Sequence, residues 1–405
     1  MAAARTLLVT LTGYDRPGVT SRLFRALSAS DATVLDVEQV VIRGRLLLGV
    51  LLEADGAARV PALVRNLRAV GAELGMDVET SEGAEEPDEP PRRSIVCVLG
   101  LPLRPAALAA ITGRIADAGG NIDGIQRIAR YPVTAVELQV SGVDPGGLRR
   151  TLAQEAATQS VDVAVQPASL LRHGVRLVVM DVDSTLVQGE VIEMLAAHAG
   201  CLEKVRDVTE AAMRGELDFE ASLRERVALL AGLDASALDR VYDELVLAPG
   251  ARTLVRTLKR LGYHFALVSG GFTQVTDRIA DDLGIAFSTA NVLDIVNGKL
   301  TGRIVGPVVD RAGKADALRR FAAEAGVALG ATVAVGDGAN DLDMLSAAGL
   351  GIAFNAKPVV QQAADTAVNV PYLDTVMYLL GISREDVEAA DAMAGVTTPA
   401  PPLGS

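Results

Sequence analysis

The distribution of apolar and polar residues divides the chain into an N-terminal part that contains two similar modules, the front modules, and a larger C-terminal part. Short apolar runs at 6–11 and 94–99 each lead to a glycine and then to an Arg-Pro pair, at 16–17 and 104–105. A stretch with helical spacing of apolar residues follows each pair, and then a second strand-like run. Each copy is predicted to fold as strand, helix, strand, strand, helix, strand, which is a small α/β module.

From residue 175 onward, apolar runs alternate with long helical stretches, a pattern typical of a parallel sheet covered by helices. The runs at 175–180, 263–268 and 331–335 each end in a cluster of polar residues. Ligands of open α/β sheets bind beyond the carboxyl ends of the strands, so these clusters are expected to converge on one site. The helical stretch 189–247 predicts a cap that excludes water, and Asn297-Gly298 predicts a hairpin.

The acidic, proline-rich stretch EGAEEPDEPP is predicted to be an extended linker, because like charges and prolines prevent a core from forming. The stretch from Val396 onward is predicted to fray. The expected division is a first module at 1–81, a linker at 82–92, a second module at 93–168, a large domain at 174–390 and a tail at 391–405.

Composition narrows the class of function. Apolar residues make up 50% of the chain and charged residues 22%, which excludes wholesale disorder. The net charge of −13 argues against a nucleic-acid or anionic-membrane partner, because phosphate backbones and such surfaces require a basic face. Two cysteines imply no disulfide framework, and no apolar run reaches the roughly 20 residues of a membrane helix. The chain is expected to be cytoplasmic.

The first two polar clusters carry groups suited to phosphate chemistry. Asp181 and Asp183 follow the first buried run, where one carboxylate can attack phosphorus and bind a metal while the other moves a proton. The Ser269-Gly270-Gly271 cluster is expected in a strand-to-helix turn, where a hydroxyl and unhindered backbone N–H groups make a cradle for phosphate.

The remaining clusters add a cation and further oxygen ligands. Lys314, at a predicted helix start, can neutralise phosphate together with the attacking carboxylate. In the segment GDGAND, Asp337 can complete an oxygen-only shell for Mg²⁺. Asn340 is expected to hydrogen-bond phosphate or orient Asp337, and Asp341 is expected in a supporting layer behind them.

The order and setting of these clusters resemble the haloacid dehalogenase-like phosphatases. The segments DVDSTLVQGEVIEMLA, AAMRGELDFEASLRERVALLAG, GPVVDRAGKADAL and VGDGANDLDML extend the resemblance to phosphoserine phosphatases over about residues 175–380. The front modules resemble the ACT fold, a ferredoxin-like module that pairs with another copy and binds small amino acids at the interface. The second copy departs from this pattern, with Ala106 where the first has Gly18.

The resemblance implies a Rossmann-like parallel sheet with a helical cap, preceded by two ferredoxin-like ACT modules. It implies Mg²⁺-dependent hydrolysis of O-phospho-L-serine, the last step of serine biosynthesis, with Asp181 forming an aspartyl-phosphate and Asp183 as general acid and base. Mg²⁺ would be held by Asp181, Asp337 and the backbone carbonyl of Asp183. Glu190 would face the substrate ammonium and Arg226 its carboxylate.

Three other functions remain open. The site could serve another small phosphate ester or a phosphoprotein, or pass the phosphoryl group to an alcohol, or be vestigial in an amino-acid sensor. The front modules are expected to form a homodimer or to bind an amino acid, with serine the leading effector. Asp15 and Gly18 would lie beside that effector. A glycine is expected at position 18 because a side chain there would crowd a ligand lying against the backbone.

Overall fold

The computed structural model describes residues 5–28, 32–54, 60–82, 93–169, 172, 174–213 and 216–399. It separates into two compact units, residues 1–90 and 91–405. The predicted linker lies largely outside the described residues. The first unit contains β1 (Arg5–Tyr14), α1 (Val19–Leu27), β2 (Ala32–Ile42), β3 (Arg45–Ala54), α2 (Val60–Leu74) and β4 (Asp77–Glu82).

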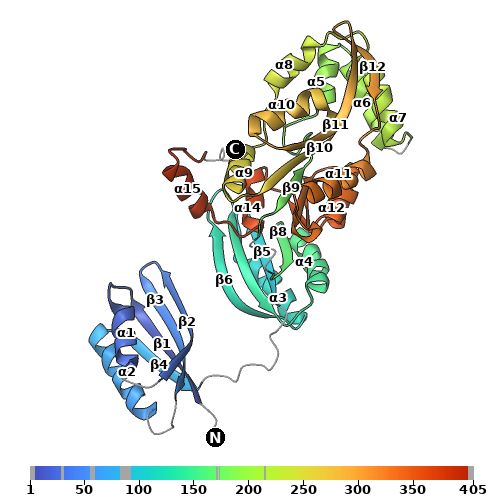
Figure 1. Cartoon of the computed structure of the whole chain (residues 1–405). Coiled ribbons are helices and arrows are strands. Elements are labelled where there is room, and N and C mark those ends of the chain that lie inside the picture. Colours follow the sequence, from blue (N-terminus) through green and yellow to red (C-terminus); the bar gives the residue numbers. More distant parts are fainter. Residues whose placement is uncertain are drawn as a thin grey trace. The chain divides into compact units, whose positions relative to one another are not determined.

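The first unit is a four-stranded antiparallel sheet, in the order β2-β3-β1-β4, covered on one face by its two helices (Figure 1). Alternate residues of β1, such as Val9 and Leu11, face α1 and α2 and form a single core. The strand β2 is exposed along almost its whole length. Only one face of this sheet is therefore buried within the unit.

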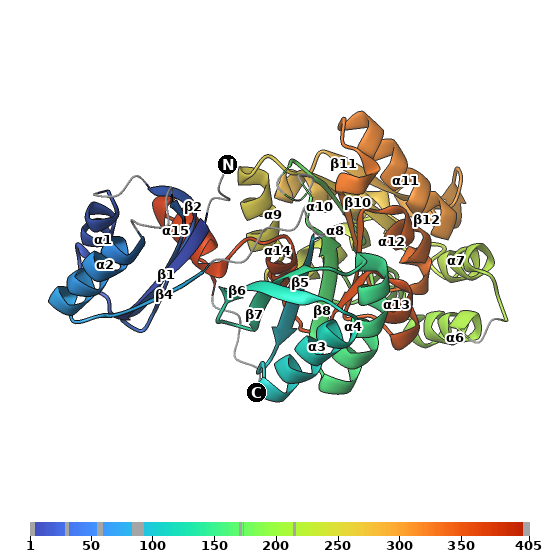
Figure 2. The same ribbon diagram turned by 90° about the horizontal axis from the view of Figure 1, so that it is seen from below.

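The second unit begins with a module of the same design, in the strand order β6-β7-β5-β8. Its elements are β5 (Arg93–Gly100), α3 (Pro105–Asp117), β6 (Asn121–Ala129), β7 (Thr134–Ser141), α4 (Pro145–Gln159) and β8 (Asp162–Pro167). The helices α3 and α4 cover one face of the sheet, as Figure 2 shows. The element order predicted for both copies is confirmed.

The C-terminal domain is a seven-stranded sheet with helices on both faces. Its strands are β9 (Leu177–Met180), β10 (His264–Phe272), β11 (Phe287–Val296), β12 (Lys299–Val305), β13 (Thr332–Gly336), β14 (Leu350–Phe354) and β15 (Thr366–Val368). Its helices are α5 (Val191–His198), α6 (Leu202–Met213), α7 (Phe219–Ala228), α8 (Ser236–Glu244), α9 (Ala251–Arg260), α10 (Thr273–Leu283), α11 (Arg311–Glu324), α12 (Leu342–Ala347), α13 (Pro358–Ala363), α14 (Val376–Leu379) and α15 (Arg384–Met393).

The strand order β12-β11-β10-β9-β13-β14-β15 places the three predicted strands β10, β9 and β13 side by side. All strands except β12 run parallel. Alternation along β9 sends Val178 and Met180 to one core and Leu177 and Val179 to the other. The polar clusters that follow these strands therefore meet at one edge of the sheet, as predicted.

A helical cap is inserted between β9 and β10. Helices α5 to α8 gather at one end of the sheet in Figure 1, and a bridge between Val187 and Leu247 joins the two ends of the insertion. The hairpin of β11 and β12 supports the cap, because a Cβ on Gly302 would lie 2.9 Å from the Cβ of Ala231. The turn at Asn297-Gly298 is confirmed, with φ of 52° and 75°.

The second module packs against the C-terminal domain through the sheet face opposite its helices. Cys97 and Ala164 on that face belong to the same apolar core as Tyr378. The Gln166 side-chain amide donates to the Leu379 carbonyl at 2.7 Å, and Asp162 accepts from the Asn369 side chain at 2.7 Å. The strands β5 and β8 of this sheet are therefore buried on both faces, in contrast to the first module, whereas β6 stays largely exposed.

The C-terminal segment is more ordered than the sequence predicts. Helix α15 continues past residue 390, and the fully buried Asp391 forms ion pairs with Arg256 and Arg260, both at 2.5 Å. Burial alone would raise the pKa of Asp391, but hydrogen bonds from Arg256, Thr398 and Arg260 lower it to about 2. This network holds the described part of the tail, through residue 399, against α9. No described helix is long and apolar enough to cross a membrane.

Candidate active site

The candidate nucleophile lies directly after the central strand β9. The Asp181 amide donates to the Val335 carbonyl at 2.9 Å, which fixes the loop against β13, and only 4% of the residue is exposed. The chain then turns sharply, with Ser184 at a φ of 58°, and returns toward the cap. Asp181 is therefore held rigidly at the meeting point of the two central strands.

Lys314 joins two of the acidic clusters. Its ammonium group is fully buried, 2.8 Å from Asp181 Oδ1 and 2.7 Å from Asp341 Oδ1. The other oxygen of Asp341 accepts from the Gly338 amide at 3.0 Å. Burial alone would lower the pKa of Lys314, but the two carboxylates raise it above its ordinary value, so the side chain stays charged. Asp341 thus positions the lysine by direct contact. This role is more specific than the supporting role that the sequence predicts for Asp341.

Three carboxylates lie close together beside Lys314, which contacts two of them, Asp181 and Asp341. Oxygens of Asp181, Asp337 and Asp341 lie within 4.8 Å of one another. Burial and the charge of Asp341 raise the pKa of Asp181 well above its usual range, and the same causes raise that of Asp337 to about 6. An oxygen-only, net negative cluster of this kind fits a hard divalent cation, which would relieve the repulsion. The side chain of Asp183 is not part of the cluster.

Asp183 is instead held between the cap and β10. Its Oδ1 accepts from the Val191 amide, the first residue of α5, at 2.8 Å, and its Oδ2 accepts from the Ser269 hydroxyl at 3.2 Å. Burial raises the pKa of Asp183, although these hydrogen bonds and Lys314 oppose the shift. A carboxyl group with a raised pKa, linked to the cap, is suited to giving and taking a proton.

The Ser-Gly-Gly cluster lies in a strand, and its prediction as a strand-to-helix turn is wrong. Strand β10 continues to Phe272, with a register shift against β11 between Val268 and Phe272. The glycines are required by close approach: a Cβ on Gly271 would lie 2.8 Å from Asp183 Oδ2, and one on Gly270 3.1 Å from the Phe219 ring.

Two residues outside the predicted set complete the framework. The fully buried Asn291 donates its side-chain amide to the Gly270 carbonyl at 2.8 Å and accepts from the Val309 amide at 2.8 Å. Thr185 donates its hydroxyl to Asp337 Oδ1 at 3.0 Å. Among the described residues it is therefore Thr185 that orients Asp337, one of the two roles predicted for Asn340. Asn291 had a signal in the sequence, because it is an isolated asparagine inside an otherwise β-rich run.

Asp181 and Asp183 open into a cavity of about 710 Å³ beneath the cap, and Glu190, Arg226, Gly270 and Asn340 also line it. Glu190 precedes α5 and Arg226 lies in the last turn of α7, with the guanidinium 3.9 Å from the carboxylate. Burial lowers the pKa of Arg226 and raises that of Glu190. The cavity thus offers a loosely joined cation and anion a short way from the acidic cluster.

The comparisons with known proteins agree with this geometry. Residues 175–349 match the haloacid dehalogenase-like hydrolase family, and residues 5–81 and 94–166 each match an ACT domain. The chain is 60% identical to a phosphoserine phosphatase of Streptomyces coelicolor, over 96% of this chain and 95% of the relative. The chain belongs to the phosphoserine phosphatase family. This relative therefore matches the chain across both ACT domains and the hydrolase domain.

Two further relatives cover most of the chain. The phosphoserine phosphatase SerB2 of Mycobacterium tuberculosis is 52% identical over 97% of both chains. A crystal structure of a probable phosphoserine phosphatase from Vibrio cholerae, in an unliganded form, is 35% identical and covers 74% of this chain and 88% of its own, with a TM-score of 0.57. The family resemblance thus extends across the front modules as well as the hydrolase domain.

Proposed function

We propose that this chain hydrolyses O-phospho-L-serine to L-serine and phosphate through an aspartyl-phosphate on Asp181. The observation that carries the proposal is the fully buried Lys314 held 2.8 Å from Asp181, a residue that lines the same cavity as Glu190 and Arg226. A buried carboxylate paired with a permanent cation matches the needs of phosphoryl transfer, where positioning and charge neutralisation supply most of the catalysis.

In the first step Asp181 attacks phosphorus in line, a P–O bond forms, and the bond from phosphorus to the serine oxygen breaks. Asp183 gives its proton to the departing oxygen, which leaves as the serine hydroxyl. In the second step Asp183 takes a proton from a water that attacks phosphorus, and Asp181 is released with inorganic phosphate. Ser269, Gly270 and Asn340 would hold the phosphoryl oxygens, and Lys314 would neutralise their charge.

Asp181, Asp337 and the backbone carbonyl of Asp183 would hold Mg²⁺. These residues fit Mg²⁺ because the negative charge of the carboxylate cluster is not fully compensated. Both oxygens of Asp341 already have partners, whereas Asp181 and Asp337 repel each other. Bound Mg²⁺ would polarise the phosphoryl group and offset its charge.

Removing the metal is expected to stop activity, and Mg²⁺ is expected to restore it. Ca²⁺ should restore little, because its larger and looser shell suits an octahedral site poorly. Mg²⁺ should also raise the melting temperature of the wild type but not of Asp337→Asn, since the cation relieves repulsion that this variant lacks. Phosphate release and differential scanning fluorimetry, both with excess chelator, check this; full activity under chelation would contradict the metal assignment.

Substrate selection is assigned to Glu190 and Arg226, which would receive the ammonium and carboxylate of the serine moiety. Replacing Arg226 with lysine should lower kcat/KM for phosphoserine by about 10–100-fold, because a fork-shaped guanidinium matches a carboxylate better than an ammonium does. Hydrolysis of p-nitrophenyl phosphate, which has neither group, should change little. Arg224→Lys, on the same helix but exposed and paired with Glu220, is the matched control.

An equal loss on both substrates would instead favour the alternative of a phosphatase for another ester. Product that depends on an added alcohol would favour phosphotransfer, and no turnover of either substrate would favour a sensor with a vestigial site.

For the front modules we propose a homodimer and inhibition by serine at Asp15 and Gly18. Asp15 is exposed and its amide donates to the Gly44 carbonyl at 2.8 Å, while Gly18 precedes α1 at a φ of 93° with open space around it. That open space leaves room for a ligand. The positive φ means that any side chain at Gly18 also strains the backbone, so Asp15→Asn is the cleaner test.

Serine is expected to inhibit the wild type non-competitively, and Asp15→Asn should weaken this inhibition several-fold while Glu79→Gln does not. Linkage requires serine to bind one state of the protein better than another. Inhibition kinetics check the first claim, and purely competitive inhibition unaffected by Asp15→Asn would contradict it.

Sedimentation of residues 91–405 checks the dimer, which should be lost. A cut near Arg172 would be unsuitable because it would expose the apolar face covered by Cys97 and Ala164.

A further inference from the structure

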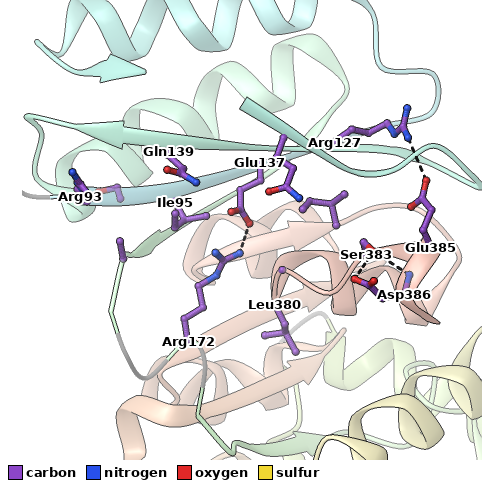
Figure 3. A pocket seen from close by; sticks show the side chains of 15 residues that line it. Arg93, Ile95, Arg127, Glu137, Gln139, Arg172, Leu380, Ser383, Glu385 and Asp386 are labelled. Atoms are coloured by element: carbon purple, nitrogen blue, oxygen red, sulfur yellow. Dashed lines mark hydrogen bonds and ion pairs between the residues drawn. The ribbon is translucent and has the colours of Figure 1, made fainter. Parts of the chain in front are cut away.

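Two cavities of the second unit are built in different ways. The one between the second module and the C-terminal domain has a volume of about 700 Å³, and Figure 3 shows ion pairs in its walls, from Arg172 to Glu137 and from Arg127 to Glu385. The protein's own side chains therefore pair these charges. In the active site it is a neutral side chain, the fully buried Asn291, that joins two segments.

Asn291 lies where the ladder between β10 and β11 is interrupted. The last regular pair joins Val268 to Thr289. The next pair joins Phe272 to Asn291, so three residues of β10 lie opposite one residue of β11. Extra residues in one strand make a bulge and take backbone groups out of the ladder. This bulge consists of Ser269-Gly270-Gly271, the segment predicted to hold phosphate.

The side-chain amide of Asn291 supplies partners that the interrupted ladder does not. Its Nδ2 donates to the Gly270 carbonyl at 2.8 Å, and its Oδ1 accepts from the Val309 amide at 2.8 Å. Only one orientation of the side chain satisfies both groups, because a carbonyl can only accept and a backbone N–H can only donate. Since Asn291 is fully buried, solvent does not compete for either contact.

On one side, Asn291 fixes the bulge. The Gly270 carbonyl and the Gly271 N–H belong to one planar peptide unit, so holding the first also directs the second. The Gly271 amide donates to the Ser269 hydroxyl at 2.7 Å, and that hydroxyl donates to Asp183 at 3.2 Å. Of the described residues, Gly270 lines the active-site cavity and Asn291 does not. Asn291 therefore acts on the cavity through the backbone.

On the other side, Asn291 fixes the approach to the buried lysine. Val309 directly precedes Asp310, the residue that caps the N-terminus of α11. The Lys314 amide donates to the Asp310 carbonyl at 2.9 Å in the first turn of that helix. One side chain thus connects the bulge with the turn that carries Lys314.

We propose that Asn291 is a positioning residue that sets the spacing between the bulge and Lys314, the two parts that would hold the transferring phosphoryl group. This inference rests on the proposed function. A displacement of about 1 Å in such a site can cost about 100-fold in rate. The phosphoryl group is held most tightly in the transition state, so loss of the link should appear in kcat and not in KM.

Two variants of the full chain break the link by different means. Asn291→Leu removes both hydrogen bonds at a similar volume, and Asn291→Asp keeps the acceptor for Val309 but places an oxygen against the Gly270 carbonyl. With Mg²⁺ present, each should lower kcat for phosphoserine by about 100-fold and change KM by less than about threefold. Vanadate, which copies five-coordinate phosphorus, should inhibit each variant about 100-fold more weakly.

The same loss of kcat is expected with p-nitrophenyl phosphate, because every ester presents the same phosphoryl group. Asn297→Asp, the same chemical change at the exposed turn of the hairpin that contains Asn291, is the control and should behave like the wild type. Scanning fluorimetry establishes that each variant is folded at the assay temperature. If Asn291→Leu does not fold, Asn291→Asp still gives the result.

Folded Asn291 variants with a kcat near that of the wild type would overturn the proposal. So would a loss that appears in the KM for phosphoserine while kcat and vanadate inhibition are kept. A wild type that hydrolyses p-nitrophenyl phosphate but not phosphoserine would instead contradict the proposed function, and the comparison of variants on p-nitrophenyl phosphate would still test Asn291.

Discussion

Replacing Asp181 with asparagine is expected to lower kcat for phosphoserine by at least about 10⁴-fold, because the attacking oxygen is lost and the volume is kept. The fold should survive. Burial and the neighbouring Asp341 raise the pKa of Asp181 well above its usual range, so its negative charge opposes folding when no cation is bound. The melting temperature in chelator should therefore be unchanged or higher.

Steady-state kinetics and scanning fluorimetry on the same preparation check both halves of this prediction. Asp316→Asn, an exposed carboxylate on α11, is the control and should leave both values unchanged. If Asp181→Asn hydrolysed phosphoserine at a rate near that of the wild type, covalent catalysis by Asp181 would be wrong.

Replacing Lys314 with methionine is expected to damage activity and stability together. Asp341, fully buried, would lose the one cation with which it pairs among the described residues, and removing one partner of a buried ion pair costs about 3–5 kcal/mol. Activity should fall by at least about 10³-fold, because the charge that neutralises the transferring group is gone.

Denaturant unfolding and phosphate release measure the two effects, with Lys299→Met, on the exposed edge strand β12, as the control. A Lys314→Met protein that lost activity but kept its full stability would show that Asp181 and Asp341 do not depend on this ion pair. Retained activity would remove Lys314 from the mechanism.

The sequence predicts the site where local pattern and topology agree. Asp181 and Asp337 each follow a buried apolar run, and in a parallel sheet such ends share one edge, so their convergence could be anticipated. The strand position of Ser269 could not, because the register shift of β10 depends on its pairing with β11. The partners of Lys314 and Asp337 could not either, since hydrogen bonds between distant segments leave no periodic trace.

The different settings of the two modules show a signal that was present in the sequence but not used. The outer face of β1 carries Leu8, Thr10 and Thr12, whereas that of β5 carries Ile95, Cys97 and Leu99. A strand that is apolar on both faces is typical of burial on both sides. The run SIVCVLG therefore already distinguishes a module packed against another domain from one with a free face.

The most direct test of the account is to trap the phosphorylated enzyme. Asp183→Asn should still let Asp181 attack an ester with a good leaving group, such as p-nitrophenyl phosphate, but should release phosphate slowly because no base activates water. Rapid acid quenching followed by mass spectrometry of peptides is expected to find a burst of nitrophenol equal to the enzyme concentration and one phosphoryl group on Asp181. Turnover without a burst, or a phosphoryl group on any other residue, would contradict the mechanism.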